Sequence, residues 1–160
     1  MSRIRPKMND WRLWVLTAGG FGLAPIAPGT VGTLAGVLLA ALLPATTIGV
    51  LFGLTMIVVS AYFCVVLGNW AEANWGRKDP PSFVLDEVLG YLICVIPFLD
   101  AGWLGLLAAF LAFRFFDILK PPPVKRFEKL RGGWGVLADD AMAGLYGALA
   151  MAVLRFSGVI

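Results

Sequence analysis

The sequence predicts an all-α, polytopic membrane protein, a helical bundle with about four or five membrane helices. Hydrophobic residues make up 59% of its 160 residues, above the roughly 45–50% of ordinary soluble proteins. The mean hydropathy is +0.84. No Asp, Glu, Lys or Arg occurs in the 59 residues from Leu13 to Ala71. A soluble helical bundle is the competing class, but its helices need a polar face, which this run does not provide.

The first residues, 1–12, are expected to form a basic leader on the cytoplasmic side. Basic residues gathered before the first apolar segment are typical of that side of a membrane. Those of the leader are Arg3, Arg5, Lys7 and Arg12. The remainder, 13–160, is expected to form a single membrane-embedded domain.

The apolar segment that follows the leader is interrupted by glycines and prolines. These are Gly19, Gly20, Gly22, Pro25, Pro28, Gly29 and Gly32. Because Gly and Pro disfavour a continuous helix, we expect a short helix or a re-entrant piece over 11–21 and then a loop to about Thr30. Irregular backbone at membrane depth is tolerated only where it packs in protein or lines a polar cavity. The segment Pro25–Thr33 is therefore a candidate site.

The remaining helices are predicted from the apolar segments and from the prolines, glycines and polar residues that interrupt them. Helices are expected over Val31–Leu43, Thr47–Asn74, 84–98, 103–119 and Asp139–Phe156. The loops 75–83 and 121–137 between them carry basic residues, which are Arg77, Lys78, Lys125, Arg126, Lys129 and Arg131. Both loops are expected on the cytoplasmic side, because basic loops and the count of spans agree. The acidic residues beside these loops then share one membrane face.

Arg114, Asp117 and Lys120 follow one another at three-residue steps near the end of an apolar helix. Residues three apart lie on one helical face, and ionised groups in apolar helices are costly and usually functional. The alternative is that Arg114 and Asp117 only pair with each other, while Lys120 extends to the interface.

Two acidic pairs, Asp86-Glu87 and Asp139-Asp140, are expected to open two different helices. An acid at a helix start is often only a cap or a partner of the helix dipole. However, carboxylates gathered with Asp117 on one membrane face would repel or protonate, unless a divalent metal ion lies between them. Ligation by oxygen alone suits Mg²⁺ or Mn²⁺. We predict Asp86, Glu87, Asp139 and Asp140 as metal ligands, and these four with Asp117 as the catalytic carboxylates.

A hard cation beside Arg114 and Lys120 indicates a phosphate ligand. Arginine offers a bidentate fork and lysine a point charge, while the Gly132-Gly133 backbone would let N–H groups approach an anion. Thr30 and Thr33 offer hydroxyls near a helix start, although a simple helix-entry turn explains that segment as well. Arg114, Lys120, Gly132, Gly133, Thr30 and Thr33 are the predicted phosphate-binding residues.

Several mechanisms are excluded by missing residues. The chain has no His, which excludes His-based phosphotransfer and Ser-His-Asp chemistry. Neither Cys64 nor Cys94 is followed by Arg at the six-residue step of a Cys-based phosphatase loop. There is also no GxxxxGK[ST] motif. If the protein is an enzyme, metal–carboxylate chemistry remains.

Three motifs in this order resemble the phosphatidylglycerophosphatase A family: APIAPGTVGTLAG, SFVLDEVLGY and FRFFDILKPPPVKRFEKLRGGWGVLADDAMAG. The resemblance spans about Gly22 to Gly147. It implies a Mg²⁺-dependent phosphatase of the bacterial cytoplasmic (inner) membrane that converts phosphatidylglycerophosphate to phosphatidylglycerol. The positions implied as functional are Thr30, Thr33, Asp86, Glu87, Arg114, Asp117, Lys120, Asp139 and Asp140.

The expected function is hydrolysis of a lipid phosphomonoester at the cytoplasmic interface, with no nucleic-acid partner. Attack by water and attack by a carboxylate, through an acyl-phosphate, both remain open. A small transporter or a non-catalytic lipid-binding protein would use the same buried charges differently. The separate charged segments are expected to converge on one pocket, and the oligomeric state is left open.

Overall fold

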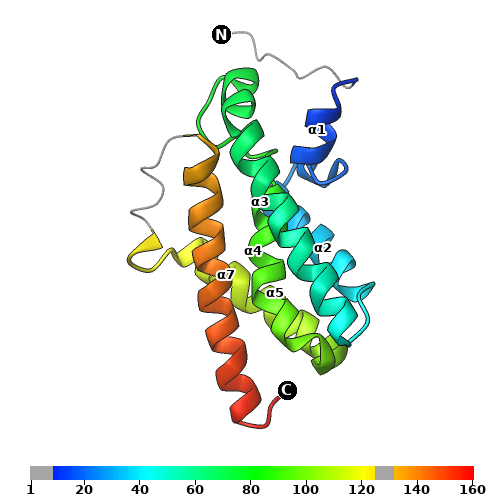
Figure 1. Cartoon of the computed structure of the whole chain (residues 1–160). Helices are drawn as coiled ribbons and strands as arrows, with labels where there is room; N and C mark the ends of the chain where they lie inside the picture. Colours follow the sequence, from blue (N-terminus) through cyan, green and yellow to red (C-terminus); the bar gives the residue numbers. More distant parts are fainter. Residues whose placement is uncertain (1–8, 125–131) are drawn as a thin grey trace.

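The computed structural model describes residues 9–124 and 132–160. Within these ranges the chain is helical and contains no strand, which confirms the predicted all-α class. The helices in chain order (Figure 1) are α1 (Trp11–Leu16), η1 (Phe21–Leu23), α2 (Pro28–Ala41), α3 (Thr47–Trp75), α4 (Leu85–Val95), η2 (Ile96–Ala101), α5 (Gly102–Leu119) and α7 (Gly133–Phe156). The basic residues expected at 3, 5, 7, 125, 126, 129 and 131 lie outside the described residues.

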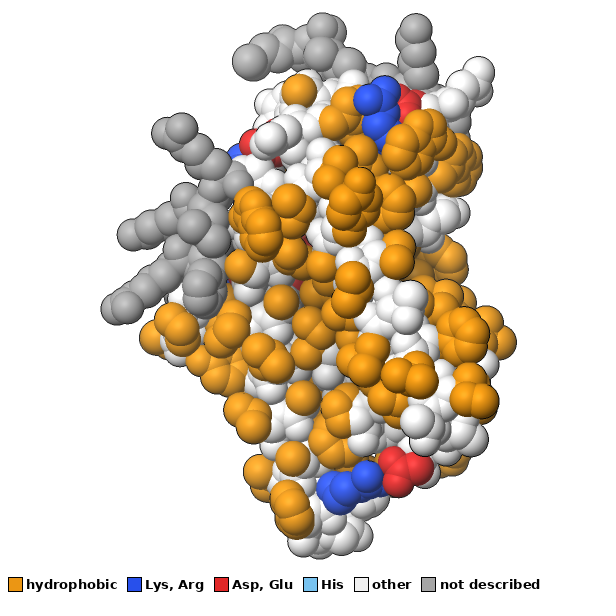
Figure 2. Space-filling model, in the orientation of Figure 1, with side chains coloured by type: hydrophobic (Ala, Val, Ile, Leu, Met, Phe, Trp, Pro, Cys, Tyr) orange, Lys and Arg blue, Asp and Glu red, His pale blue; other side chains and the backbone are white. Residues whose placement is uncertain are grey.

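In the described part of the chain, three stretches are long and apolar enough to cross a membrane: Thr47–Trp75, Leu85–Leu119 and Gly133–Phe156. Helix α2 is a shorter apolar helix. Hydrophobic side chains cover the middle of the face in Figure 2, and charged side chains lie toward its two ends. Large apolar side chains such as Val58 and Leu149 are 67% and 64% exposed, as lipid contact requires. The chain is therefore a membrane helical bundle.

The stretch Leu85–Leu119 reverses direction at η2, so that α4 and α5 form a hairpin. The Tyr91 hydroxyl of α4 donates a hydrogen bond to the Leu106 carbonyl of α5 at 3.1 Å. Pro97 near the start of η2 and the positive φ of Gly102 (+62°) make the reversal, because proline ends a helix and glycine tolerates a positive φ.

Helix α4 lies at the centre of the bundle, where it contacts α2, α3, α5 and α7. Its side chains, such as Val88, Tyr91 and Leu92, are almost completely buried. The first turn of α4 carries Asp86 and Glu87. Because every side of the helix is covered, this acidic pair is held inside the bundle rather than at its surface.

Helices α4 and α7 touch through glycine backbone. A Cβ atom on Gly90 would lie 2.6 Å from the carbonyl oxygen of Asp140, and one on Gly144 would collide with the carbonyl of Gly90. One turn further along, a Cβ on Gly147 would lie 2.7 Å from the sulfur of Cys94. Small residues of this kind let membrane helices approach closely, and here they bring Asp140 to the level of α4's acidic pair.

The expected start of the last helix at Asp139 was wrong, because α7 begins at Gly133. A Cβ on Gly133 would collide with the carbonyl of Cys64, and Gly68 of α3 packs directly on this glycine. These glycines therefore permit a close helix crossing instead of forming a loop. Asp139 and Asp140 lie in the second turn of α7, so they do not cap it. Helix α2 likewise starts earlier than expected, at Pro28, a residue that favours the first helical position.

We expect Gly144→Leu to destabilise the protein by about 1–3 kcal/mol or more, because the new side chain forces α7 away from α4. Leu149→Phe is the matched control: it adds volume on the same helix at a side chain that is 64% exposed, and should change stability by less than about 0.5 kcal/mol. Equilibrium unfolding in detergent micelles measures both. Equal stability of the two variants would contradict the crossing described here.

Candidate active site

Three carboxylates from two helices meet at the start of α4. Asp86, Glu87 and Asp140 each offer an oxygen, and these oxygens all lie within 4.8 Å of one another. Asp86 is 4% exposed and Asp140 is 5% exposed. The prediction that separate acidic segments converge is therefore confirmed for Asp86, Glu87 and Asp140. All their potential metal-binding atoms are oxygens, which suits a hard divalent cation.

Helix α2 contributes its first turn to the same place. A Cβ on Gly29 would lie 2.5 Å from Oε1 of Glu87 and 3.5 Å from Nη1 of Arg114. The absence of a side chain at Gly29 lets the Glu87 carboxylate and the Arg114 guanidinium lie against the start of α2. The Thr33 hydroxyl is buried and donates to the Gly29 carbonyl at 2.9 Å, which fixes this turn. Thr30 is partly buried one residue after Gly29.

The end of α5 supplies the cations. Nη1 of Arg114 lies 2.6 Å from Oδ2 of Asp117, with the two side chains 16% and 13% exposed. One turn later Lys120, at the C-cap of α5, places its Nζ 2.8 Å from Oδ2 of Asp139. The expected ion pair between Arg114 and Asp117 is therefore present in the structure. The pair also lies against the carboxylate cluster, since Arg114 is near Glu87 across Gly29.

Several buried polar atoms of this site have no hydrogen-bond partner. They are Oδ1 of Asp86, Oε2 of Glu87, Oδ1 of Asp139 and Nε and Nη1 of Arg114; the last lies within ion-pair distance of Asp117 but not in hydrogen-bond geometry. Buried polar groups are normally satisfied, and leaving one unpaired is costly. Orphaned oxygens fit a cation, and orphaned guanidinium nitrogens fit an anion. The residues present therefore fit a metal ion with a phosphate.

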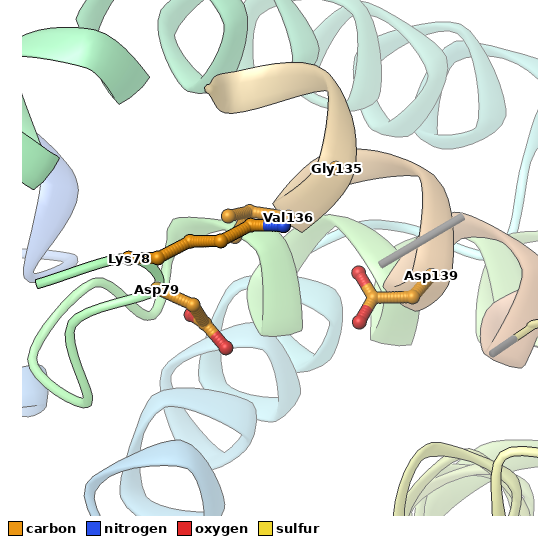
Figure 3. A pocket seen from close by; sticks show the side chains of 5 residues that line it. All are labelled: Lys78, Asp79, Gly135, Val136 and Asp139. Atoms are coloured by element: carbon orange, nitrogen blue, oxygen red, sulfur yellow. The ribbon is translucent and has the colours of Figure 1, made fainter. Parts of the chain in front are cut away.

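Asp139 is not a member of the cluster of Asp86, Glu87 and Asp140, and its contacts are with other groups. Its carboxylate pairs with Lys120 and also faces a pocket of about 300 Å³. The pocket is lined by Lys78, Asp79, Gly135, Val136 and Asp139, and Figure 3 shows the carboxylates of Asp79 and Asp139 facing it from two sides. Its predicted role as a metal ligand stays a prediction.

Asp79 is a residue that the sequence reasoning missed. Although it is exposed through the pocket, the surrounding protein limits the hydration of its carboxyl, and this desolvation with repulsion from Asp139 raises the pKa of Asp79 above its usual range. The available signal was an acid before Pro80 and Pro81 in a loop that leads into the Asp86-Glu87 helix. Lys78 was used only to predict the side of the membrane.

The predicted phosphate-binding pair Gly132-Gly133 packs against α3. A Cβ on Gly132 would collide with the side chain of Asn69, and Gly133 contacts Cys64 and Gly68. The positive φ of Gly132 (+60°) and the backbone contact of Gly133 explain why glycine is needed at both positions without any ligand. Their role in binding phosphate stays a prediction.

A membrane helical bundle with buried carboxylates, orphaned polar atoms and paired cations defines the class as a membrane protein with an acidic, metal-compatible site. Comparison with known proteins is more specific. The model of the phosphatidylglycerophosphatase A family matches residues 14–155, and the chain belongs to this family. It is accordingly a phosphatase, a phosphoric monoester hydrolase.

Three curated relatives are similar over most of their length. A phosphatidylglycerophosphatase A of Haemophilus influenzae is 37% identical over 148 residues, which is 88% of this chain and 88% of the relative. A putative phosphatidylinositol-3-phosphatase of Bacteroides thetaiotaomicron is 36% identical over 146 residues, 88% of this chain and 91% of the relative. A phosphatidylglycerophosphatase A of Escherichia coli K12 is 34% identical over 166 residues, 99% of this chain and 90% of the relative. No solved structure matches.

Arg114→Met is expected to destabilise the protein by about 3–5 kcal/mol, because it leaves the Asp117 carboxylate buried and unpaired. Removing both charges, in Arg114→Met with Asp117→Asn, should recover most of this loss. The control is Arg155→Met, whose partner Asp100 is 61% exposed, and which should cost at most about 1 kcal/mol. Equilibrium unfolding in detergent with a metal chelator measures all three. A double variant no more stable than Arg114→Met would contradict the pairing.

Proposed function

We propose that this chain hydrolyses phosphatidylglycerophosphate to phosphatidylglycerol and phosphate, with Mg²⁺ as its metal. The observation that carries the proposal is the arrangement of Asp86, Glu87 and Asp140 within 4.8 Å of one another, beside Arg114 and Lys120. Two of the three relatives above are named for this activity. The relative named for phosphatidylinositol-3-phosphatase makes that lipid the substrate to compare.

In this proposal Asp86, Glu87 and Asp140 hold the metal ion, with Asp139 as a further ligand or as the anchor of Lys120. When bound, Mg²⁺ supplies Lewis-acid chemistry, because it withdraws charge from a phosphoryl group and makes water more acidic. All-oxygen ligation of this kind is what Mg²⁺ uses in phosphoryl-transfer enzymes. In this chain, Oδ1 of Asp86 and Oε2 of Glu87 are buried and have no hydrogen-bond partner, which supports this assignment.

Arg114 and Lys120 hold the non-bridging phosphate oxygens. A phosphate monoester carries a charge of about −1.5 to −2 at neutral pH, and cations placed where charge develops lower the barrier. Nε of Arg114 is buried and lacks a hydrogen-bond partner, so the guanidinium has a donor to offer besides Nη1, which pairs with Asp117. Asp117 positions Arg114, and Asp139 positions Lys120, through the ion pairs described above.

A carboxylate of the site takes up the proton of the attacking water as the P–O bond to the lipid breaks, and it returns that proton to the departing lipid oxygen. Glu87 and Asp117 are the candidates for this role. Thr30, at the start of α2, assists at the phosphate, as does the Gly132-Gly133 backbone, and Thr33 supports this turn through its hydrogen bond to the Gly29 carbonyl. A carboxylate nucleophile that forms an acyl-phosphate is the competing route. Trapping a phosphorylated enzyme would decide for that route.

We further propose that the site faces the cytoplasm and that the protein resides in the bacterial inner membrane. Helix α1, which carries Arg12, and the loop after α3, which carries Arg77 and Lys78, lie at one end of the bundle in Figure 1. Arg155, in the last turn of α7 at the opposite end, pairs with Asp100. Basic residues favour the cytoplasmic side. Residues 13–160 form a single phosphatase domain in this proposal, and the acyl chains of the substrate remain in the bilayer.

Purified protein in mixed micelles should release phosphate from phosphatidylglycerophosphate only with Mg²⁺, and chelation should stop the release reversibly. Asp140→Asn should lower the rate by about 100-fold or more, since even residues outside the ligand shell cost about 10–100-fold. Asp100→Asn, a carboxylate at the opposite end of the bundle, is the matched control and should leave the rate unchanged. Phosphatidylinositol 3-phosphate serves as the comparison lipid.

Release of phosphate without a divalent ion would refute the metal assignment. If properly folded protein releases no phosphate but moves solute across vesicles, the transporter alternative replaces the phosphatase proposal.

The sidedness is tested with single added cysteines, since Cys64 and Cys94 are buried and should not react with a membrane-impermeant maleimide. Arg77→Cys should be labelled only after the inner membrane is opened, because the loop after α3 faces the cytoplasm. Ser157→Cys, beyond the opposite end of α7, should be labelled in intact spheroplasts. The reverse pattern would show that the site faces outward.

A further inference from the structure

The pocket beside Asp139 is joined to the proposed active site without being part of the three-carboxylate cluster. Asp139 lines the pocket and pairs with Lys120 at 2.8 Å. Asp79, on the other wall, lies within electrostatic reach of Asp139, Lys120 and Asp117, and of its neighbour Arg77. If Lys120 holds the phosphate of a bound molecule, the part of that molecule attached to the phosphate would therefore extend into this pocket.

The loop that supplies Lys78 and Asp79 is anchored to the bundle. Asp79 has a left-handed backbone (φ +47°), which is uncommon for a residue other than glycine. After Asp79, the Phe83 amide donates to the Pro80 carbonyl at 2.9 Å, and the Val84 amide donates to the Leu16 carbonyl at 2.9 Å. Unusual backbone of this kind persists where the surrounding structure enforces it, often at ligand sites.

The size and chemistry of the pocket select a small polar group. Its volume of about 300 Å³ is at the lower end of the roughly 300–1,000 Å³ of small-molecule sites. One wall offers an ammonium group and a carboxylate from the loop, and the other offers the Asp139 carboxylate beside Gly135, which has no side chain to fill the space (Figure 3). An ammonium group binds an anion, whereas carboxylates accept hydrogen bonds from hydroxyls and repel phosphates.

We propose that this pocket binds the linker of a lipid headgroup that carries a second phosphate: Lys78 contacts the phosphodiester, and Asp79 accepts a hydrogen bond from a hydroxyl between the two phosphates. The inference rests on the proposed function, because it assumes that the terminal phosphate lies at Arg114 and Lys120. It makes Lys78 and Asp79 specificity-determining residues. A lipid with one phosphate, such as phosphatidate, has no group for Lys78 to contact.

The test compares phosphatidylglycerophosphate with phosphatidate of the same acyl chains, using the full chain with Mg²⁺ in mixed micelles. Lys78→Ala should raise KM for phosphatidylglycerophosphate about tenfold or more, the loss expected for one charge-assisted hydrogen bond, while kcat changes less than about twofold. Turnover of phosphatidate should be unaffected. Asp79→Asn should act in the same direction, and Lys78→Arg should restore most of the selectivity.

Arg77→Ala is the matched control, because it removes a neighbouring positive charge that does not line the pocket. If Arg77→Ala raises KM as much as Lys78→Ala does, the effect is one of general surface charge and the proposal fails. Equal losses on both lipids for Lys78→Ala would also overturn it.

Binding separates this proposal from the proposed function. Dissociation constants for both lipids are measured by equilibrium binding on Asp140→Asn protein, with and without Lys78→Ala. A loss of about tenfold or more, limited to phosphatidylglycerophosphate, supports the pocket whether or not the unaltered chain hydrolyses that lipid. An unchanged dissociation constant refutes it. Absence of hydrolysis by the unaltered chain would refute the proposed function alone.

Discussion

The structure depends on how negative charge is accommodated inside an apolar bundle. Burial of an ionised carboxylate without a partner costs several kcal/mol. Two of the site's carboxylates are neutralised by ion pairs, Asp117 by Arg114 and Asp139 by Lys120. Asp86, Glu87 and Asp140 remain together, so the bundle encloses a group of carboxylates that could hold a metal ion.

Several helices together bring the charged residues of the site to one place. Helix α4 is short and covered on all sides, which keeps its acidic first turn buried. The hairpin with α5 returns the chain so that Arg114 and Lys120 lie at the same level. Helix α7 then adds its own acids through the glycine contact with α4. The outer faces of α3 and α7 are apolar and hold the bundle in the bilayer. The acids of α7 lie on its inner face.

The sequence was sufficient to predict the class and the meeting of Asp86, Glu87 and Asp140 from separate segments near Arg114. Charge is so scarce between Leu13 and Ala71 that the acids and cations elsewhere stand out, and rows such as Arg114, Asp117 and Lys120 have a fixed geometry on a helix.

Glycine was harder to interpret. Gly132 and Gly133 could mark a loop or a close contact, and only the position of α3 decides between them. The helix start was therefore placed six residues too late. Asp79 was missed for a related reason, since its approach to Asp139 follows from a left-handed loop residue whose conformation no local pattern requires.

The glycine contact between Gly90 and Gly144 has a mechanical consequence. At Gly90 and Gly144 the spacing of α4 and α7, and with it that of Asp86 and Asp140, is set by backbone packed on backbone. A bilayer that is too thick or too thin changes helix tilt at a cost of only fractions of a kcal/mol per ångström. Such a change tilts α4 and α7 together as one unit. The carboxylates thus keep their geometry as the thickness of the bilayer varies.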